Sequence, residues 1–311
     1  MSDYAIETNK LTKKYHGFSA VDQLDLQVRA GSVFGFLGPN GAGKTTTINM
    51  LLGIIHPSGG TATVLDHPAG DKIALKKVGF LPEKIGFHPF LTGIEFLYAL
   101  GKLSGMGGES LRKRVKEALD FTGLGDRGSD RIGSYSRGMQ QRLGLAQALL
   151  HQPDLIILDE PTSALDPIGR REVRDVILYL KRQGCTIFLN SHLLSEIEKT
   201  CDEVAILKAG RVIEAGAMED LLAAGNAVEI EVEDMNEKAL AELRMLTFKL
   251  RMEEMPPRKF TAYFNSPTQT PEIARALVEN GVRLKALIPR KESLEDLFVR
   301  VVEGEENTPG S

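Results

Sequence analysis

The sequence predicts an α/β protein with two domains. An apolar run at residues 33–37 leads through a glycine-rich loop into a helical segment at 45–52, and two further apolar runs, 155–158 and 186–189, flank an amphipathic segment at 169–183. Short apolar runs joined by an amphipathic helix are typical of buried parallel strands in a βαβ unit. The 311 residues are also long enough for two domains of ordinary size.

Composition narrows the classes of function. The chain carries 38 Lys+Arg against 42 Asp+Glu, a net charge of −4, so we expect no nucleic-acid partner. The apolar runs are far shorter than the ~20 residues that cross a bilayer, and the N-terminus lacks the apolar core of a secretory signal. These features predict a cytoplasmic protein without a membrane span. Cys185 and Cys201 lack metal-ligand spacing and are expected as buried small hydrophobes.

Elements of the first domain follow in order along the chain. We expect strands at 5–8, 24–28, 33–37 and 61–65, with the helix 45–52 before the last of them. Between residues 92 and 150 apolar residues recur at helical spacing, which predicts an inserted helical subdomain. After the βαβ unit, a hairpin is expected at 204–208 and 211–214.

The C-terminal part has a different pattern of apolar and polar residues. We expect, in order, a strand, a helix, two strands, a helix, a strand and a terminal helix, at 228–232, 237–245, 247–251, 260–265, 271–280, 282–288 and 293–302. The order β-α-β-β-α-β is the split βαβ pattern of a small α+β, ferredoxin-like domain. The expected domains are therefore 4–220 and 226–303, followed by a disordered acidic tail at 304–311.

A complete phosphate-binding loop follows the apolar run 33–37. Its pattern G-x-x-x-x-G-K-[ST], between a strand and a helix, is filled by Gly38, Pro39, Asn40, Gly41, Ala42, Gly43, Lys44 and Thr45. Glycines let backbone N–H groups surround a polyphosphate, while Lys44 reaches the β/γ-phosphates and Thr45 coordinates Mg²⁺. Thr46 can donate to the α-phosphate. A glycine-rich turn without a ligand is the alternative, and the complete motif in the required context disfavours it.

A carboxylate pair ends the apolar run 155–158. Asp159 is placed to hold Mg²⁺ through its water shell, as the Walker-B aspartate of phosphate-loop enzymes does. Glu160 comes next and is placed to polarise an attacking water as general base. A solvated loop is the alternative for such a pair, but the complete phosphate loop disfavours it.

Three further motifs carry a resemblance to one family. Residues 135–142 read Tyr-Ser-Arg-Gly-Met-Gln-Gln-Arg, residues 163–166 read Ser-Ala-Leu-Asp, and His192 follows the run 186–189. In this order they resemble the signature motif, the D-loop and the switch histidine of ABC ATPases, over residues 4–220. The resemblance implies a P-loop NTPase ABC ATPase domain with a RecA-like core, an antiparallel β subdomain and a helical subdomain.

The resemblance also implies further site residues. Ser136 and Gly138 would face the γ-phosphate of a nucleotide bound by a second subunit, which requires a dimer. His192 would donate a hydrogen bond to the γ-phosphate or orient the attacking water. Tyr15 stands where the family places an aromatic ring that stacks on adenine. A structural histidine and a strand-edge tyrosine are the alternatives for the last two.

Two departures from the family pattern matter. The usual signature Leu-Ser-Gly-Gly-Gln has Tyr135, Arg137 and Met139 at its first, third and fifth positions. Where the family has a metal-binding glutamine, this chain has Glu83, whose carboxylate can still contact hydrated Mg²⁺. Both forms, and the terminal motif at 293–298, resemble the subfamily that serves ABC-2 type exporters.

The sequence therefore predicts an ATP-hydrolysing motor that uses ATP and Mg²⁺ and acts as a homodimer or heterodimer. The resemblance implies integral membrane permease subunits on separate chains, export, and a peripheral place on the cytoplasmic face of the plasma (inner) membrane. A soluble ABC ATPase of translation or DNA repair is the alternative. The single phosphate loop, the absence of sustained heptads and the absence of a basic excess disfavour it. A regulator that only binds nucleotide would lack Lys44 or Glu160, and both are present.

Overall fold

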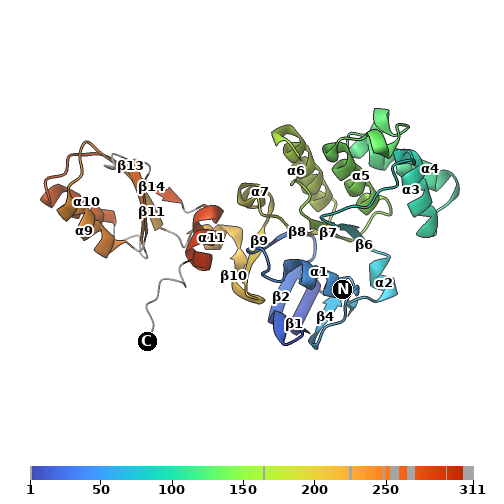
Figure 1. Cartoon of the computed structure of the whole chain (residues 1–311), viewed down its shortest axis with the longest axis horizontal. Helices are drawn as coiled ribbons and strands as arrows, with labels where there is room; N and C mark the ends of the chain where they lie inside the picture. The colour runs from blue at the N-terminus through green and yellow to red at the C-terminus, as the bar shows by residue number, and fades with distance from the viewer. Residues whose placement is uncertain are drawn as a thin grey trace. The chain divides into compact units, whose positions relative to one another are not determined.

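A computed structural model of the chain describes residues 2–163, 165–223, 226–247, 249–252, 259–264, 270–291 and 293–303. The chain divides into two compact units, Met1–Gly216 and Ala217–Ser311 (Figure 1). The predicted tail at 304–311 lies outside the described residues. Within the described part, no helix is both long and apolar enough to span a lipid bilayer.

A six-stranded sheet forms the centre of the first unit. Its order is β10-β9-β3-β8-β7-β6, and the pairings from β9 through to β6 are parallel. The strands are β3 (Val33–Leu37), β6 (Val78–Leu81), β7 (Leu155–Asp159), β8 (Thr186–Asn190), β9 (Glu203–Lys208) and β10 (Arg211–Ala217). Every residue of β3, β7 and β8 is buried. Burial on both faces explains why these strands read as continuous apolar runs rather than alternating ones.

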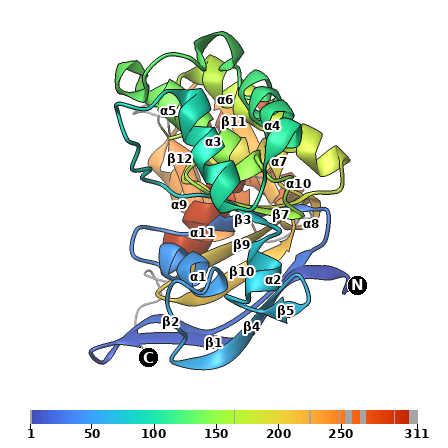
Figure 2. The same cartoon turned by 90° about the vertical axis from the view of Figure 1, so that its right-hand side faces the viewer.

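A second, antiparallel sheet shares one core with the first sheet and with one helix. Its order is β2-β1-β4-β5, with β1 (Tyr4–Tyr15), β2 (Phe18–Arg29), β4 (Gly59–Val64) and β5 (His67–Pro68). Helix α1 (Lys44–Leu51) lies between the two sheets (Figure 2). Its buried side chains Ile48, Met50 and Leu51 join a core with Val64 of β4 and Phe36 of β3. The helix that follows the phosphate loop is thus fixed from both sides.

The remaining helices of this unit include the predicted helical subdomain. Helices α3 (Gly93–Leu103), α4 (Gly108–Phe121) and α5 (Arg137–Leu149) share a core that includes Leu97, Leu119 and Leu143. The N-terminus of α3 is fixed by a capping box, in which Thr92 and Glu95 bond each other's backbone N–H. Outside the subdomain lie α2 (Lys72–Leu75), α6 (Pro167–Arg182) and α7 (Leu194–Thr200).

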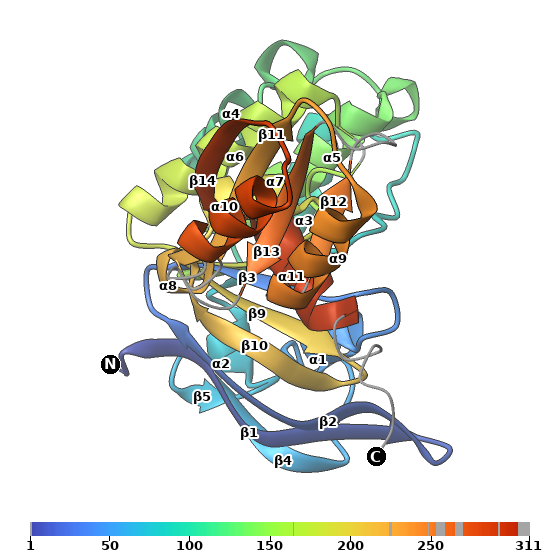
Figure 3. The same ribbon diagram turned by 90° about the vertical axis from the view of Figure 1, so that its left-hand side faces the viewer.

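The second unit has the predicted split βαβ topology. Its antiparallel sheet has the order β12-β13-β11-β14, and α9 and α10 lie side by side over the sheet (Figure 3). Each βαβ crossover therefore skips one strand, because β13 separates β11 from β12 and β11 separates β13 from β14. The elements are α8 (Met218–Ala223), β11 (Asn226–Val232), α9 (Glu237–Leu246), β12 (Lys249–Met252), β13 (Lys259–Phe264), α10 (Thr270–Glu279), β14 (Leu284–Lys291) and α11 (Leu294–Glu303).

The prediction from the sequence missed several elements and made others too short. Strands β1 and β2 have 12 residues each, far longer than the expected 5–8 and 24–28. Their register shifts at several points, so the alternation of apolar and polar residues that marks a strand is broken there. Strand β6 was not predicted, because it has only four residues and its burial depends on pairing with β7. Helices α2, α7 and α8 are similarly short.

Candidate nucleotide-binding site

The predicted site residues of the core follow the carboxyl ends of parallel strands. The phosphate loop follows β3, Asp159 ends β7 and Glu160 follows it, His192 follows β8, and Glu83 follows β6. Parallel strands place their carboxyl ends at one edge of the sheet, which is where open α/β sheets bind ligands. The sheet order therefore brings together residues that are more than 150 positions apart in the chain.

The phosphate loop presents an uncapped helix terminus. Gly43 is the N-cap of α1, has a left-handed conformation and makes no side-chain cap, and the first turn of α1 contains no acidic residue. Thr45 is exposed and Thr46 is half-buried. The first N–H groups of a helix have no partner within it and favour an anion. The loop itself is held by Ala42, whose N–H donates to the Pro39 carbonyl (3.2 Å) and whose carbonyl accepts from Gly210 (3.0 Å).

Lys44 lies across this loop. Its Nζ donates to the carbonyl oxygens of Gly38 (2.7 Å) and Pro39 (3.0 Å). Burial lowers the pKa of Lys44, and the charges of Glu160 and Asp159 act in the opposite direction. The ammonium group is thus within electrostatic reach of both carboxylates.

Asp159 is a buried carboxylate, 3% exposed. The Nδ2 of Asn190, at the end of β8, donates to its Oδ1 at 2.5 Å. Burial raises the pKa of Asp159; the Asn190 hydrogen bond lowers it, the charge of Glu83 raises it and that of Lys44 lowers it. The structure thus identifies Asn190 as a partner of Asp159 that sequence reasoning missed. A polar residue in an otherwise apolar buried strand was the available signal.

The oxygen atoms of this region suit Mg²⁺. Thr45 offers a hydroxyl, and Asp159 and Glu83 offer carboxylates that sense each other's charge. Mg²⁺ prefers hard oxygen ligands and usually takes only one or two carboxylates from the protein, with waters and phosphates completing its shell. The described residues contain no group of three or more His, Cys, Asp or Glu that could hold a metal by itself.

Glu160 has an unusual backbone and a close partner. Its φ is +56°, in the left-handed region, and its Oε2 lies 2.7 Å from Nδ1 of His192. The Glu160 side chain is 13% exposed and the His192 side chain 63% exposed. Burial raises the pKa of Glu160, whereas the charge and hydrogen bond of His192 lower it. Strained backbone of this kind is found preferentially at functional sites.

The signature motif begins a helix, as the sequence predicted. Ser136 is the exposed N-cap of α5, and its Oγ accepts a hydrogen bond from the N–H of Met139 at 3.2 Å. Gly138 lies in the first turn. The departure at Tyr135 also has a structural role, because this ring is buried and its hydroxyl donates to the carbonyl of Arg127 at 2.7 Å.

The structure brings some of the predicted residues together and places others at separate points. The charges of Lys44, Glu83, Asp159 and Glu160 act on one another's pKa, and a hydrogen bond joins Glu160 to His192. Ser136 and Gly138 lie at the start of α5, and no hydrogen bond from either of them to this group is recorded among the described residues. Tyr15 ends β1, is 43% exposed, and has the ammonium of Lys13 5.1 Å from its ring centre.

Some residues that the sequence analysis singled out stabilise the fold. In the D-loop, Asp166 is the N-cap of α6, with its Oδ1 accepting from the N–H of Gly169 at 2.7 Å, and Ala164 lies outside the described residues. Cys185 and Cys201 are buried free thiols, as expected.

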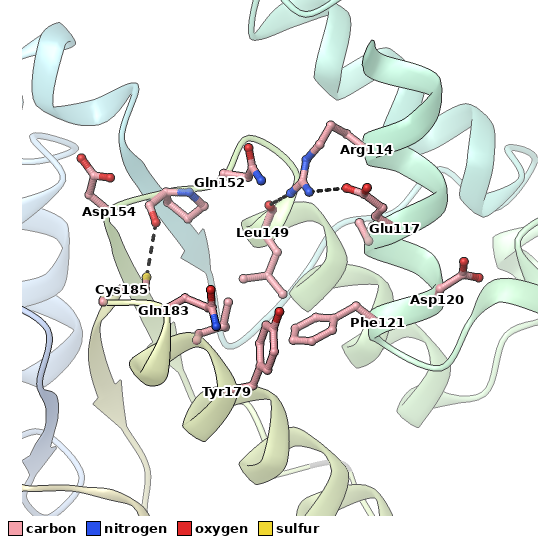
Figure 4. A pocket seen from close by; sticks show the side chains of 14 residues that line it. Arg114, Glu117, Asp120, Phe121, Leu149, Gln152, Asp154, Tyr179, Gln183 and Cys185 are labelled. Atoms are coloured by element: carbon pink, nitrogen blue, oxygen red, sulfur yellow. Dashed lines mark hydrogen bonds and ion pairs between the residues drawn. The ribbon is translucent and has the colours of Figure 1, made fainter. Parts of the chain in front are cut away.

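A separate pocket of about 810 Å³ lies between the helical subdomain and the start of β7 and β8 (Figure 4). Phe121 of α4 and Tyr179 of α6 meet across it, with ring centres 5.1 Å apart. The guanidinium of Arg114, which lines the pocket, donates hydrogen bonds to the Glu117 carboxylate (2.6 Å) and to the Leu149 carbonyl (3.1 Å). This pocket contains none of the predicted site residues.

Comparisons with known proteins agree with this geometry. A family model described as ABC transporter matches residues 21–163. An uncharacterized ABC transporter ATP-binding protein of Synechocystis sp. is 38% identical over 304 residues, which cover 95% of this chain and 84% of that protein. The bacitracin transport ATP-binding protein of Bacillus licheniformis is 37% identical over 303 residues, 96% of this chain and 97% of that protein. The daunorubicin/doxorubicin resistance ATP-binding protein of Streptomyces peucetius is 35% identical over 302 residues, covering 95% and 91%.

Solved structures give the same result for the fold. The ATP-binding subunit of an ABC transporter superposes with a TM-score of 0.65 at 28% identity, covering 70% of this chain and 92% of that chain. A dimeric, post-hydrolysis form of the ATP-binding cassette MJ0796 bound to ADP and Pi gives 0.63 at 25% identity, covering 68% and 98%. The predicted fold class is confirmed. This chain belongs to the ATP-binding proteins of ABC transporters, and it is the nucleotide-binding subunit, an ATPase.

Proposed function

We propose that the chain is the peripheral motor of an exporter, in which two ATPase subunits close on ATP and drive separate permease chains. The observation that carries the proposal is the convergence of Lys44, Asp159, Glu160 and His192 at one edge of the sheet. Phosphoryl transfer to water requires a cation that binds the phosphates, a carboxylate that binds the metal, and a group that orients the attacking water. Here these are Lys44, the buried Asp159 and the Glu160–His192 pair. The domain limits 4–220 and 226–303 belong to the same proposal.

The phosphate loop would hold the nucleotide. Backbone N–H groups of the loop and the start of α1 would surround the phosphates, and Lys44 would exchange its bonds to Gly38 and Pro39 for the β- and γ-phosphate oxygens. Tyr15 would stack on the adenine. The nucleotide-contacting set is Gly38, Pro39, Asn40, Gly41, Ala42, Gly43, Lys44, Thr45 and Thr46, with Ser136 and Gly138 from the partner.

Three oxygen groups would hold Mg²⁺, namely the Thr45 hydroxyl and the carboxylates of Asp159 and Glu83. When bound, Mg²⁺ neutralises charge that develops on the phosphate oxygens. Asn190 keeps the Asp159 carboxylate oriented, and Lys44 favours its ionised form.

Glu160 would act as the general base. It takes a proton from water as the water oxygen bonds the γ-phosphorus and the bond to the ADP oxygen breaks, and His192 holds the carboxylate in place. Because burial raises the pKa of Glu160, its carboxylate is a stronger base than an exposed glutamate. Such tuning is usual for catalytic carboxylates.

The partner subunit would complete the site. At the start of α5, Ser136 is exposed and Gly138 is half-buried, which suits contact with a nucleotide held by a second subunit. ATP has the γ-phosphate that bridges the two halves and ADP lacks it, so ATP favours the closed pair. The intact motifs allow a homodimer with two active sites, and a heterodimer is equally compatible with them. The chain would sit on the cytoplasmic face of the plasma (inner) membrane.

The test uses a variant that traps ATP. A tagged Glu160→Gln chain is expressed in its native host, membranes are solubilised with ATP and Mg²⁺, and co-purifying proteins are identified by mass spectrometry. A stoichiometric polytopic membrane protein is expected, and its sequence identifies the permease chain. Recovery of ribosomal or DNA-repair proteins without a membrane partner would refute the proposal. The matched control is Glu109→Gln, at an exposed position of α4 for which no ion pair is recorded in the described part of the chain.

A further inference from the structure

The peptide of Glu160 is held from three sides. Its N–H donates to the Asn190 carbonyl at 2.9 Å, and its carbonyl accepts from Oγ of Ser163 at 3.2 Å. The third bond comes from Gln141, whose Nε2 donates to the same carbonyl at 3.2 Å. A residue with φ of +56° persists only where its surroundings fix it. These bonds therefore set the direction in which the Glu160 carboxylate points.

Gln141 differs from the other two contacts because it comes from the signature helix. It lies on α5, five residues after Ser136, and is only 8% exposed. A buried amide without a partner is unfavourable, so the bond to Glu160 accounts for a glutamine at this position. Helix α5 thus makes two connections. Its N-terminus faces solvent, and its buried Gln141 side chain bonds the peptide of Glu160 in the same chain.

We propose that Gln141 is a positioning residue that couples the signature end of α5 to the Glu160 of its own chain. The inference rests on the proposed dimer, in which the start of α5 contacts the nucleotide held by the partner. A helix of 13 residues moves as one body. When the partner's nucleotide engages Ser136, the position of α5 is fixed, and Gln141 fixes the Glu160 peptide with it. Occupancy of one site thereby prepares the base of the other.

The coupling has a thermodynamic consequence. If a nucleotide at one site stabilises the productive conformation of the second base, hydrolysis depends cooperatively on ATP concentration. Gln141 carries this coupling without touching nucleotide, so its removal is expected to change turnover and cooperativity and to leave intrinsic nucleotide affinity unchanged. If Gln141 only filled space, its replacement would not change turnover and cooperativity while leaving nucleotide affinity unchanged.

The test replaces the donor without changing the side-chain length. Gln141→Met is compared with Gln147→Met, on the same helix, in the full chain. The Gln147 side chain is half-buried, and no hydrogen bond of it is recorded in the described part of the chain. We expect Gln141→Met to lower kcat about tenfold and the Hill coefficient for ATP from above 1 to about 1, with the Kd of a non-hydrolysable ATP analogue within twofold of wild type. Gln147→Met should keep the wild-type kcat and Hill coefficient.

A double-variant cycle shows whether Gln141 acts through Glu160. In a Glu160→Gln background, adding Gln141→Met should leave the residual single-turnover rate unchanged within about twofold, because the group it positions is gone. A further tenfold loss there, a wild-type Hill coefficient of 1, or a Gln141→Met enzyme with wild-type kcat would each overturn the inference. Failure of the wild-type chain to dimerise on ATP would instead overturn the proposed function.

Discussion

Two glycines of the phosphate loop provide a sharp test of the structure. Gly43 and Gly41 both have positive φ, +107° and +81°, so alanine at either position pays the left-handed penalty of about 1–2 kcal/mol. They differ in the space available. A Cβ on Gly43 would stand 2.4 Å from the carbonyl oxygen of Ala20 in β2, whereas a Cβ on Gly41 meets nothing within 4 Å.

The expected magnitudes follow from this difference. Overpacking of a fixed backbone costs a further ~1–3 kcal/mol, so Gly43→Ala should be less stable than Gly41→Ala by that amount. For a unit of the size of Met1–Gly216, 1 kcal/mol corresponds to roughly 2–4 °C in the melting temperature, so ~1–3 kcal/mol should place the melting of Gly43→Ala about 2–12 °C below that of Gly41→Ala. The assay is a thermal melt of the nucleotide-free full chain, with both variants beside wild type. Equal melting of the two variants would refute the assignment of Gly43 to close contact with β2.

Three further predictions concern the site. Lys44→Ala should weaken ATP binding at least about 100-fold, because charge-assisted hydrogen bonds to the phosphates are lost, and calorimetric titration that finds wild-type affinity would contradict the role of Lys44. His192→Ala should shift the acid limb of the pH–rate profile to higher pH, since His192 lowers the pKa of Glu160 and burial alone would leave it higher; a limb that stays in place or moves to lower pH would argue against this pairing. Tyr135→Phe should cost about 1 kcal/mol by removing the hydrogen bond to Arg127, measured by denaturant unfolding, and unchanged stability would show that this bond does not anchor the signature loop.

Sequence periodicity predicted the elements that are buried on both faces. Strands β3, β7 and β8 are apolar at nearly every position because each face meets core, and such runs are visible without a structure. Strands β1 and β2 are solvated on one face and interrupted by register shifts, so only parts of them stood out. The same reasoning explains β6, whose four residues become a strand only beside β7.

Motifs with fixed spacing were readable because their chemistry is local. The loop from Gly38 to Thr45 builds a phosphate site from consecutive backbone groups and one helix terminus, so the order of residues along the chain is enough to predict it. Glu160 was predicted as a base from its place after the buried strand. Its left-handed backbone and raised pKa come from groups on other elements.

The sequence by itself determined the fold class, the phosphate loop, the acidic pair and the family. Only the tertiary structure decided which distant side chains act together, because hydrogen bonds across strand ends depend on sheet order and not on spacing. Asn190 meets Asp159, and Gln141 meets Glu160, across separations of 31 and 19 residues. Neither contact has a sequence pattern of its own. Burial, which sets the pKa directions of Lys44, Asp159 and Glu160, likewise exists only once the chain is folded.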